Sequence, residues 1–165
     1  MHDLMQVTRT KHDFDFLFGR WSVRNRRLTR QLAGSEEWEE FAATSVTRPL
    51  LDGLGNEDEF RTDHDGGMIG MAFRFFDEGT GQWSIYWADS RRSGLLDPPV
   101  IGSFSGGVGV FEGSDVLDGK AIGVRFVWSN TYSSEPRWEQ AFSEDGGRTW
   151  ETNWIMELSR IEDAR

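Results

Sequence analysis

The sequence predicts an all-β protein: a single antiparallel up-and-down β-barrel of about ten strands, preceded by a short helical plug. Three observations carry this prediction. About ten short segments alternate between apolar and polar residues with period two. Nearly every junction between them contains glycine, and no amphipathic helix follows the plug. Such a string of strands must hide its edges in a sandwich or a barrel, and the simple strand order favours the barrel.

Length and composition predict one domain that spans residues 1–165. A chain of 165 residues is of ordinary single-domain size and can bury most of the surface that its unfolded form exposes. Aromatic residues make up 13% of the chain and include eight tryptophans, so the core is expected to rest on a few large side chains. The absence of cysteine excludes disulfides and thiol chemistry.

The charge balance argues against two classes of partner. Eighteen basic and 28 acidic side chains give a formal charge of −10, which repels phosphate backbones and anionic membrane surfaces. The sequence has neither the apolar run of a secretory signal nor the roughly 20 apolar residues of a membrane span. We therefore predict a cytoplasmic protein that binds no nucleic acid and no membrane.

The first elements are the plug and a hairpin. An apolar cluster lies between Phe14 and Phe18 and is followed by Gly19. The first predicted strand follows this glycine, with Trp21 near its start and its end at residue 28. The turn at residues 33–35 returns the chain through a second strand at residues 37–48, which Pro49 is expected to end. The arginines of the first strand are expected to pair with the acidic residues 36–40 across this hairpin.

The middle of the chain alternates clearly. A weak, charged strand is predicted at residues 56–62. A strand at residues 68–76 carries Met71, Phe73 and Phe75 on one face, and Phe73 is expected to share the inward face with the tryptophans. A third strand at residues 82–89 places Trp83, Ile85 and Trp87 on one face. The long loop at residues 89–99 follows, and such loops are where function tends to lie.

The last five strands are predicted at residues 100–104, 108–112, 121–128, 137–143 and 150–160. Residues 143–150 resemble the Asp-box hairpin, in which the aspartate, here Asp145, accepts bonds from backbone N–H groups of the turn. The glycine, Gly147, supplies a conformation that other residues avoid, and Trp150 packs underneath. We interpret this hairpin as a structural device.

The start of the first strand resembles a known superfamily. Gly19 and Trp21 open that strand after the plug, and Arg160 ends the last strand. This arrangement resembles the calycin superfamily, which holds the lipocalins and the fatty-acid-binding proteins. The resemblance implies a barrel in which a basic side chain from the last strand packs over the tryptophan of the first.

A fuller resemblance covers nearly the whole chain and rests on residues 12–17, 37–41, 49–56, 96–99 and 138–143. In these segments the chain resembles an uncharacterised bacterial family of calycin-like domains. The resemblance implies the barrel fold and no established activity.

No catalytic or metal site emerges from the pattern. The three histidines, His2, His12 and His64, have no partners at the spacing of a zinc site. Haem-binding calycins use a histidine late in the chain as the iron ligand, and this sequence has no histidine after His64. The chain also lacks a nucleophile elbow and a phosphate loop. We predict no metal, no cofactor and no catalytic residue.

The inward face predicts a binding barrel. Indoles with a few convergent polar groups are typical of a ligand pocket, whereas a filled small barrel needs mostly aliphatic side chains. The predicted ligand is small and largely apolar or aromatic, and Arg27, if it reaches the interior, would suit an acidic group on it. The predicted ligand-binding residues are Asn25, Arg27, Trp38, Trp87, Asp89, Trp128, Gln140 and Trp154.

Two alternatives stay open. An isomerase or hydrolase would use Asp89 with an arginine at the cavity mouth, and would need a carboxylate of raised pKa. An interaction domain would bury a second aromatic face, formed by Phe41, Phe76 and Tyr86, in a homodimer, and would need a filled barrel with an apolar outer patch.

Overall fold

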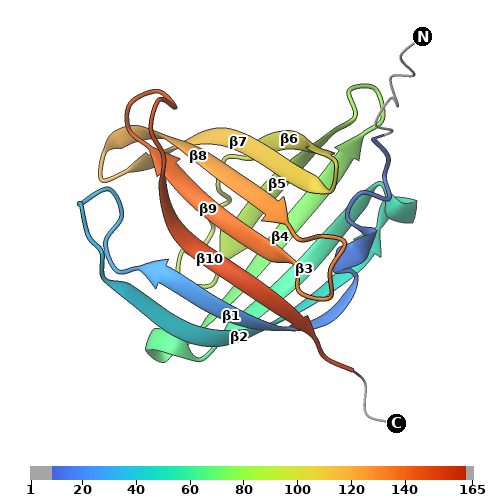
Figure 1. Cartoon of the computed structure of the whole chain (residues 1–165), viewed down its shortest axis with the longest axis horizontal. Helices are drawn as coiled ribbons and strands as arrows, with labels where there is room; N and C mark the ends of the chain where they lie inside the picture. The colour runs from blue at the N-terminus through green and yellow to red at the C-terminus, as the bar shows by residue number, and fades with distance from the viewer. Residues whose placement is uncertain (1–8, 163–165) are drawn as a thin grey trace.

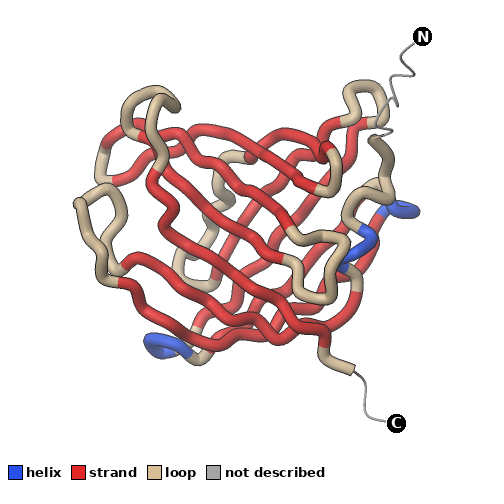
Figure 2. Tube along the Cα trace, in the orientation of Figure 1, coloured by secondary structure: helices blue, strands red, loops and turns tan. Residues whose placement is uncertain are grey.

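The computed structural model describes residues 9–162 and shows a closed antiparallel barrel of ten strands (Figure 1). Each strand pairs with its neighbours in the chain, and the first pairs with the last. Within these residues, helix is confined to three single turns of 3₁₀ type, η1 (Asp15–Leu17), η2 (Leu51–Gly53) and η3 (His64–Gly66) (Figure 2). The strands are β1 (Gly19–Leu28), β2 (Trp38–Leu50), β3 (Gly55–Thr62), β4 (Met68–Asp77), β5 (Gln82–Asp89), β6 (Val100–Ser105), β7 (Val108–Leu117), β8 (Lys120–Ser129), β9 (Arg137–Ser143) and β10 (Glu151–Arg160).

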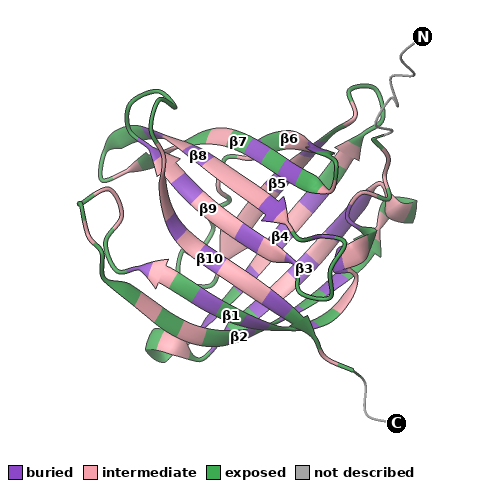
Figure 3. Ribbon diagram, in the orientation of Figure 1, coloured by how far each residue is buried: buried purple, intermediate pink, exposed green. Residues whose placement is uncertain are grey.

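The predicted fold class is therefore confirmed. Buried and exposed residues alternate along most strands, as the bands of Figure 3 show, because successive side chains point to opposite sides of the barrel wall. Over residues 9–162, no helix has the length and apolar character needed to cross a membrane.

Two strands run at least two residues beyond their predicted ends. Strand β2 continues through Pro49 to Leu50, and not only to residue 48. The pairing of β1 with β2 ends at Thr47, so beyond it one edge of β2 has no partner strand and the missing N–H of proline is tolerated. Strand β7 extends to Leu117 instead of residue 112, because its polar second half, Gly113 to Asp115, still pairs with β8.

The plug closes one end of the barrel, at the right in Figure 1. Its 3₁₀ turn η1 spans Asp15–Leu17. Phe14 is fully buried and meets the rings of Trp83 and Phe104 edge-on, at centroid distances of 4.9 Å each. Such edge-to-face packing supplies both apolar burial and favourable ring electrostatics. The plug thus fills this end of the interior with aromatic rings.

The calycin-like contact between the two end strands is present. The Trp21 side chain is buried, and its indole N–H donates to the carbonyl oxygen of Leu17 at 2.8 Å. The guanidinium carbon of Arg160 lies 4.2 Å from the centre of the Trp21 ring. The same guanidinium donates to the carbonyl oxygens of Phe16 and Phe18, so it ties β10 to the plug as well as to β1.

The predicted face of β4 is wrong. Phe73 was expected to share the interior with the tryptophans, but Ala72 and Arg74 line the cavity. Phe73 lies between these two residues on the strand, so its side chain points to the opposite face. The error arises because β4 carries apolar side chains on both faces, so period two fixes the alternation without fixing its direction.

The Asp-box hairpin forms as expected between β9 and β10. Asp145 Oδ1 accepts the N–H groups of Arg148 and Thr149 at 3.0 and 2.9 Å, and Gly147 adopts a φ of 87°. The Trp150 indole donates to the carbonyl oxygen of Gly147 at 3.1 Å. The side-chain hydroxyl of Thr149, followed by its N–H and the Ser143 hydroxyl, lowers the pKa of Asp145 from 3.8 to about 2.

This hairpin is expected to make stability depend on acid. Because the pKa of Asp145 is lower in the folded state, the unfolded chain binds the proton more tightly. The stabilisation is complete above about pH 4 and is lost as the pH falls towards about 2. Urea denaturation across this range should show the stability difference between the wild type and Asp145→Asn shrinking as acid is added. A difference that stays constant down to the lowest pH would contradict the assignment.

Candidate functional site

A cavity of about 310 Å³ lies inside the barrel, beyond the plug. Its walls come mainly from β4, β5, β8, β9 and β10, and its rim comes from the segment after β5 and from the β7–β8 hairpin. Aromatic side chains dominate the lining and include Phe60, Trp87, Phe126, Trp128, Trp138 and Trp154. A volume of this size is at the lower end of the range of small-molecule sites.

The structure brings five of the eight predicted binding residues together in the cavity lining. Two others point into the barrel without lining the cavity, and one lies on the outer face. The five in the lining are Trp87, Asp89, Trp128, Gln140 and Trp154.

Trp38 is the predicted site residue that the structure places elsewhere. Its side chain is 38% exposed, and the guanidinium carbon of Arg26 lies 5.9 Å from its ring centre. The inward positions of β2 include Ala43 and Ser45, which are small and buried. Hydrophobicity alone assigned the bulky indole to the interior, but Trp38 lies on the same face of β2 as Ala42, Thr44 and Val46, which are exposed. Trp38 is therefore not a cavity residue.

Asn25 and Arg27 point into the barrel and contact Trp154, a residue of the cavity lining. The Trp154 indole donates to Asn25 Oδ1 at 3.0 Å, which fixes the ring that faces the cavity. The guanidinium carbon of Arg27 lies 4.9 Å from the Trp154 ring and 5.0 Å from the Phe41 ring. Arg27 also donates to Glu39 at 2.9 Å, which confirms one pair of the expected first hairpin. Because this guanidinium already has a carboxylate, it gives no reason for an acidic ligand.

Asp89 organises the rim. Its carboxylate accepts the Trp87 indole N–H at 3.0 Å, the Arg91 backbone N–H at 3.0 Å and the Arg92 guanidinium at 3.2 Å. Burial favours a higher pKa for Asp89, but the bond from Trp87, the other bonds and the charge of Arg92 outweigh it and lower the pKa. The group is therefore held ionised.

Trp87 owes its position to a neighbouring glycine. A Cβ atom at Gly70 would lie 2.1 Å from the indole Cη2 of Trp87, so the ring occupies the space that any other residue would fill. The packing therefore directs this indole across β4.

Sequence reasoning missed Arg74, the most buried charge in the cavity lining. Its side chain is 4% exposed and donates to Asp58 Oδ2 at 2.6 Å and to Asn56 Oδ1 at 2.8 Å. Its Nε atom has no hydrogen-bond partner among the described residues. The alternation of Asn56, Asp58 and Phe60 along β3 was the available signal, because it places two polar groups on the same face as an aromatic residue.

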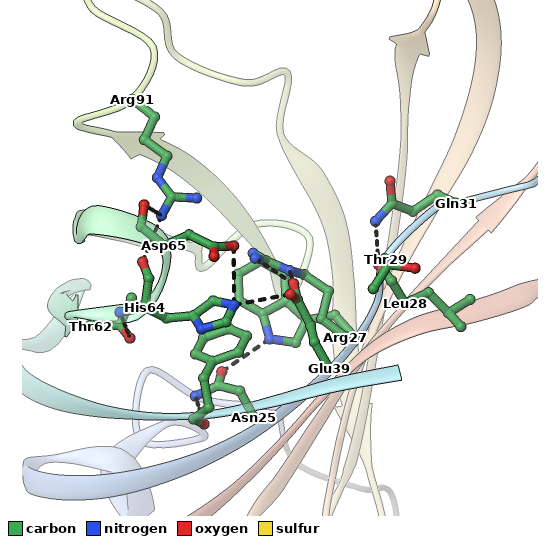
Figure 4. A network of polar contacts seen from close by, with 12 residues as sticks. Asn25, Arg27, Leu28, Thr29, Gln31, Glu39, Thr62, His64, Asp65 and Arg91 are labelled. Carbon is green, nitrogen blue, oxygen red and sulfur yellow. Dashed lines mark hydrogen bonds and ion pairs between the residues drawn. The ribbon is translucent and has the colours of Figure 1, made fainter. Parts of the chain in front are cut away.

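A second polar cluster lies at the barrel end opposite the plug (Figure 4). His64 lies between two carboxylates: its Nε2 atom is 3.0 Å from Glu39 and 3.2 Å from Asp65. Its ring stacks on Phe41 at a centroid distance of 4.3 Å. The hydrogen bonds from His64 and from Arg27 outweigh the effect of burial and lower the pKa of Glu39.

One potential ligand atom from each of Glu39, His64 and Asp65 lies within 4.8 Å of the others, a grouping that a metal ion could use. Sequence spacing did not reveal it, since Glu39 is far from the other two along the chain. Arg27 already holds Glu39, so the cluster is satisfied by its own hydrogen bonds. His12 lies apart, bonded to Asp15, and His2 falls outside the described residues.

Comparison with known proteins supports the fold. No family model matches the sequence, and no curated protein matches it. Among solved structures, the chain is similar to an S-type phycobiliprotein lyase from Guillardia theta, with a TM-score of 0.60 and 10% identity. The match covers 96% of each chain. At this identity the likeness concerns the barrel fold alone, and the resemblances to the calycin superfamily and to the uncharacterised bacterial family stay predictions.

Proposed function

We propose that the barrel binds a small, largely apolar or aromatic molecule in its cavity. The observation that carries the proposal is a space of about 310 Å³ whose lining includes seven indole and phenyl rings together with aliphatic side chains. A domain that used the barrel only as a scaffold would gain stability by filling such a space, because empty apolar volume forfeits packing energy. One solved structure of similar fold is that of a phycobiliprotein lyase, which supports a role in binding a small molecule.

The predicted site residues take two roles in this proposal. Trp87, Trp128 and Trp154 offer flat apolar faces to the ligand, and Gln140 and Asp89 offer polar groups. Asn25 and Arg27 act through Trp154: Asn25 accepts the hydrogen bond of its indole N–H, and the Arg27 guanidinium lies over its ring. The formal charge of −10 supports a small ligand rather than nucleic acid or an anionic membrane surface.

The two alternatives are less well supported. A catalytic carboxylate at the mouth needs a raised pKa to carry a proton near neutral pH, and the pKa of Asp89 is lowered. The homodimer hypothesis needs Phe41, Phe76 and Tyr86 on one outer face. Phe41 instead stacks on His64 and meets Trp154, and Phe76 packs against Trp83 in the core, so this patch does not form.

Binding is expected to quench tryptophan fluorescence saturably when the protein is titrated with a panel of apolar and aromatic metabolites. Trp128→Phe and Gln140→Ala should each weaken the affinity, by about threefold to tenfold, because each removes a contact from the wall. Trp38→Phe is the matched control, since Trp38 lies outside the barrel, and it should leave the affinity unchanged.

Two results would contradict the binding proposal. No saturable response from any member of the panel, in a protein that thermal unfolding shows to be folded, would rule out the proposed function for that ligand class. Equal weakening by Trp38→Phe would mean that the cavity is not the binding site.

A further inference from the structure

The cavity lining carries more negative than positive charge. Four carboxylates and two guanidiniums line it, so its formal charge is −2 at neutral pH. An aromatic cavity of neutral character would not discriminate between charged forms of one ligand, whereas an excess of carboxylates favours the cationic form. The carboxylates belong to Asp58, Asp89, Asp97 and Asp115, and the guanidiniums belong to Arg74 and Arg92.

Both guanidiniums already have carboxylate partners. Arg74 bonds Asp58 at 2.6 Å deep in the wall. Arg92 bonds Asp97 at 2.7 Å and Asp89 at 3.2 Å at the rim, and these bonds raise the pKa of Arg92 far above its ordinary value. An anionic ligand would have to break one of these pairs or enter against the excess of carboxylates. The cavity is therefore poorly suited to acids.

Asp115 is the carboxylate that lacks a cation. It lies on β7 opposite Ile122 of β8. Among residues 9–162, its side chain accepts one hydrogen bond, from the backbone N–H of Val116 at 2.7 Å, and makes no ion pair. Its remaining acceptor capacity is thus available at the cavity, where partial exclusion of water strengthens attraction between charges.

The aromatic walls add a second attraction for cations. Within the described part of the chain, no guanidinium lies over the rings of Trp87, Trp138, Phe126 or Phe142, whereas Arg27 already covers Trp154. An uncovered ring face attracts a cation within about 6 Å of its centre, and tryptophan does so best. Carboxylate and ring faces therefore favour the same kind of ligand group.

We propose that the cavity selects molecules that combine an apolar or aromatic body with a positively charged group, a protonated amine or a quaternary ammonium, and that Asp115 is the counter-charge. This inference rests on the proposed binding function and defines the ligand class within it. The aromatic walls hold the body and the rim holds the cation.

The test compares three probes of nearly equal shape by isothermal titration calorimetry at neutral pH: naphthylmethylamine, which is cationic, naphthylmethanol, which is neutral, and naphthoate, which is anionic. The amine is expected to bind about tenfold more tightly than the alcohol, and naphthoate most weakly. Raising the ionic strength should weaken binding of the amine and leave that of the alcohol unchanged.

Asp115→Asn keeps the shape of the side chain and removes its charge. It should weaken binding of the amine about fivefold or more and leave that of the alcohol within about twofold. Glu112→Gln is the matched control: it removes the same charge from an exposed position of the same strand, so both affinities should stay as in the wild type. Thermal unfolding verifies that both variants fold.

The outcomes separate the two proposals. If no probe binds, the binding function fails for this ligand class, and the charge selection fails with it. If the alcohol or naphthoate binds as tightly as the amine, the barrel binds ligands but does not select cations. If Asp115→Asn weakens the amine and the alcohol equally, Asp115 acts through shape, and its role as counter-charge is overturned. The salt dependence decides the question even if Asp115→Asn does not fold.

Discussion

Replacing Arg74 with methionine is expected to lower the free energy of unfolding by about 3–5 kcal/mol, the range for removing one partner of a buried ion pair. Methionine fills a similar volume, so the loss arises from the groups left behind. Asp58 keeps a carboxylate in a buried position without its cation, and Asn56 loses its donor. Leaving such groups unpaired costs more than the original pair contributed.

Urea denaturation followed by tryptophan fluorescence measures this change. The control is Arg24→Met, because Arg24 pairs with Glu157 on the outer surface with its own side chain 71% exposed. That variant should lose less than about 1 kcal/mol. Adding Asp58→Leu to Arg74→Met should recover part of the lost stability, since it removes the stranded charge. If Arg74→Met cost no more than Arg24→Met, the buried pair would not be formed in solution.

Trp21→Ala is expected to lower the free energy of unfolding by about 3–5 kcal/mol, the range for deleting a large buried aromatic side chain. Trp21 is 2% exposed and holds the plug through the carbonyl oxygen of Leu17. Its removal also takes away the ring under Arg160, which joins β10 to the plug. The loss should therefore appear as weaker closure of the barrel end as well as a cavity in the core.

Two further variants divide this effect. Trp21→Phe keeps most of the packing and loses the indole N–H, so it should cost less than the alanine variant, about 1–2 kcal/mol. Trp38→Ala removes an exposed tryptophan of the same strand pair and should cost less than about 1 kcal/mol. Similar denaturation midpoints for Trp21→Ala and Trp38→Ala would show that the plug does not depend on Trp21.

The alternation of the sequence was sufficient to predict the barrel. Strands β5 and β9 have the predicted bounds, Gln82–Asp89 and Arg137–Ser143, because glycine turns or a long loop border them and their side chains alternate without interruption. Period two is a property of the extended backbone itself, so it survives in the sequence wherever one face is buried. The packing of Arg160 over Trp21 followed from the resemblance rather than from periodicity.

The direction of each face was less predictable. On β2 and β4 both faces carry apolar side chains, so hydrophobicity assigned Trp38 and Phe73 to the interior in error. Closure of the barrel decides this direction, because it fixes which face of every strand is concave. Arg74 was missed because a charged side chain was assigned to the outer face. A buried arginine is stable only with partners, and its partners, Asp58 and Asn56, lie on another strand.

The arrangement of the cavity depends on contacts that spacing does not encode. His64 meets Glu39 because the end of β3 lies beside the start of β2. Whether Asp115 has a cationic partner depends on which arginine side chains reach the rim of the cavity. Such facts require side-chain positions, whereas the presence of an aromatic interior required only composition and alternation.

The pairing of β5 with β6 comprises three residue pairs, from Trp83 with Gly102 to Ile85 with Val100, whereas β4 and β5 pair over eight. Beyond Ile85, the last residues of β5 border the rim of the cavity. Local opening costs least where few backbone hydrogen bonds hold two strands together. The barrel wall beside the cavity is therefore expected to open most readily along this short strand pairing, while the other strand pairs stay formed.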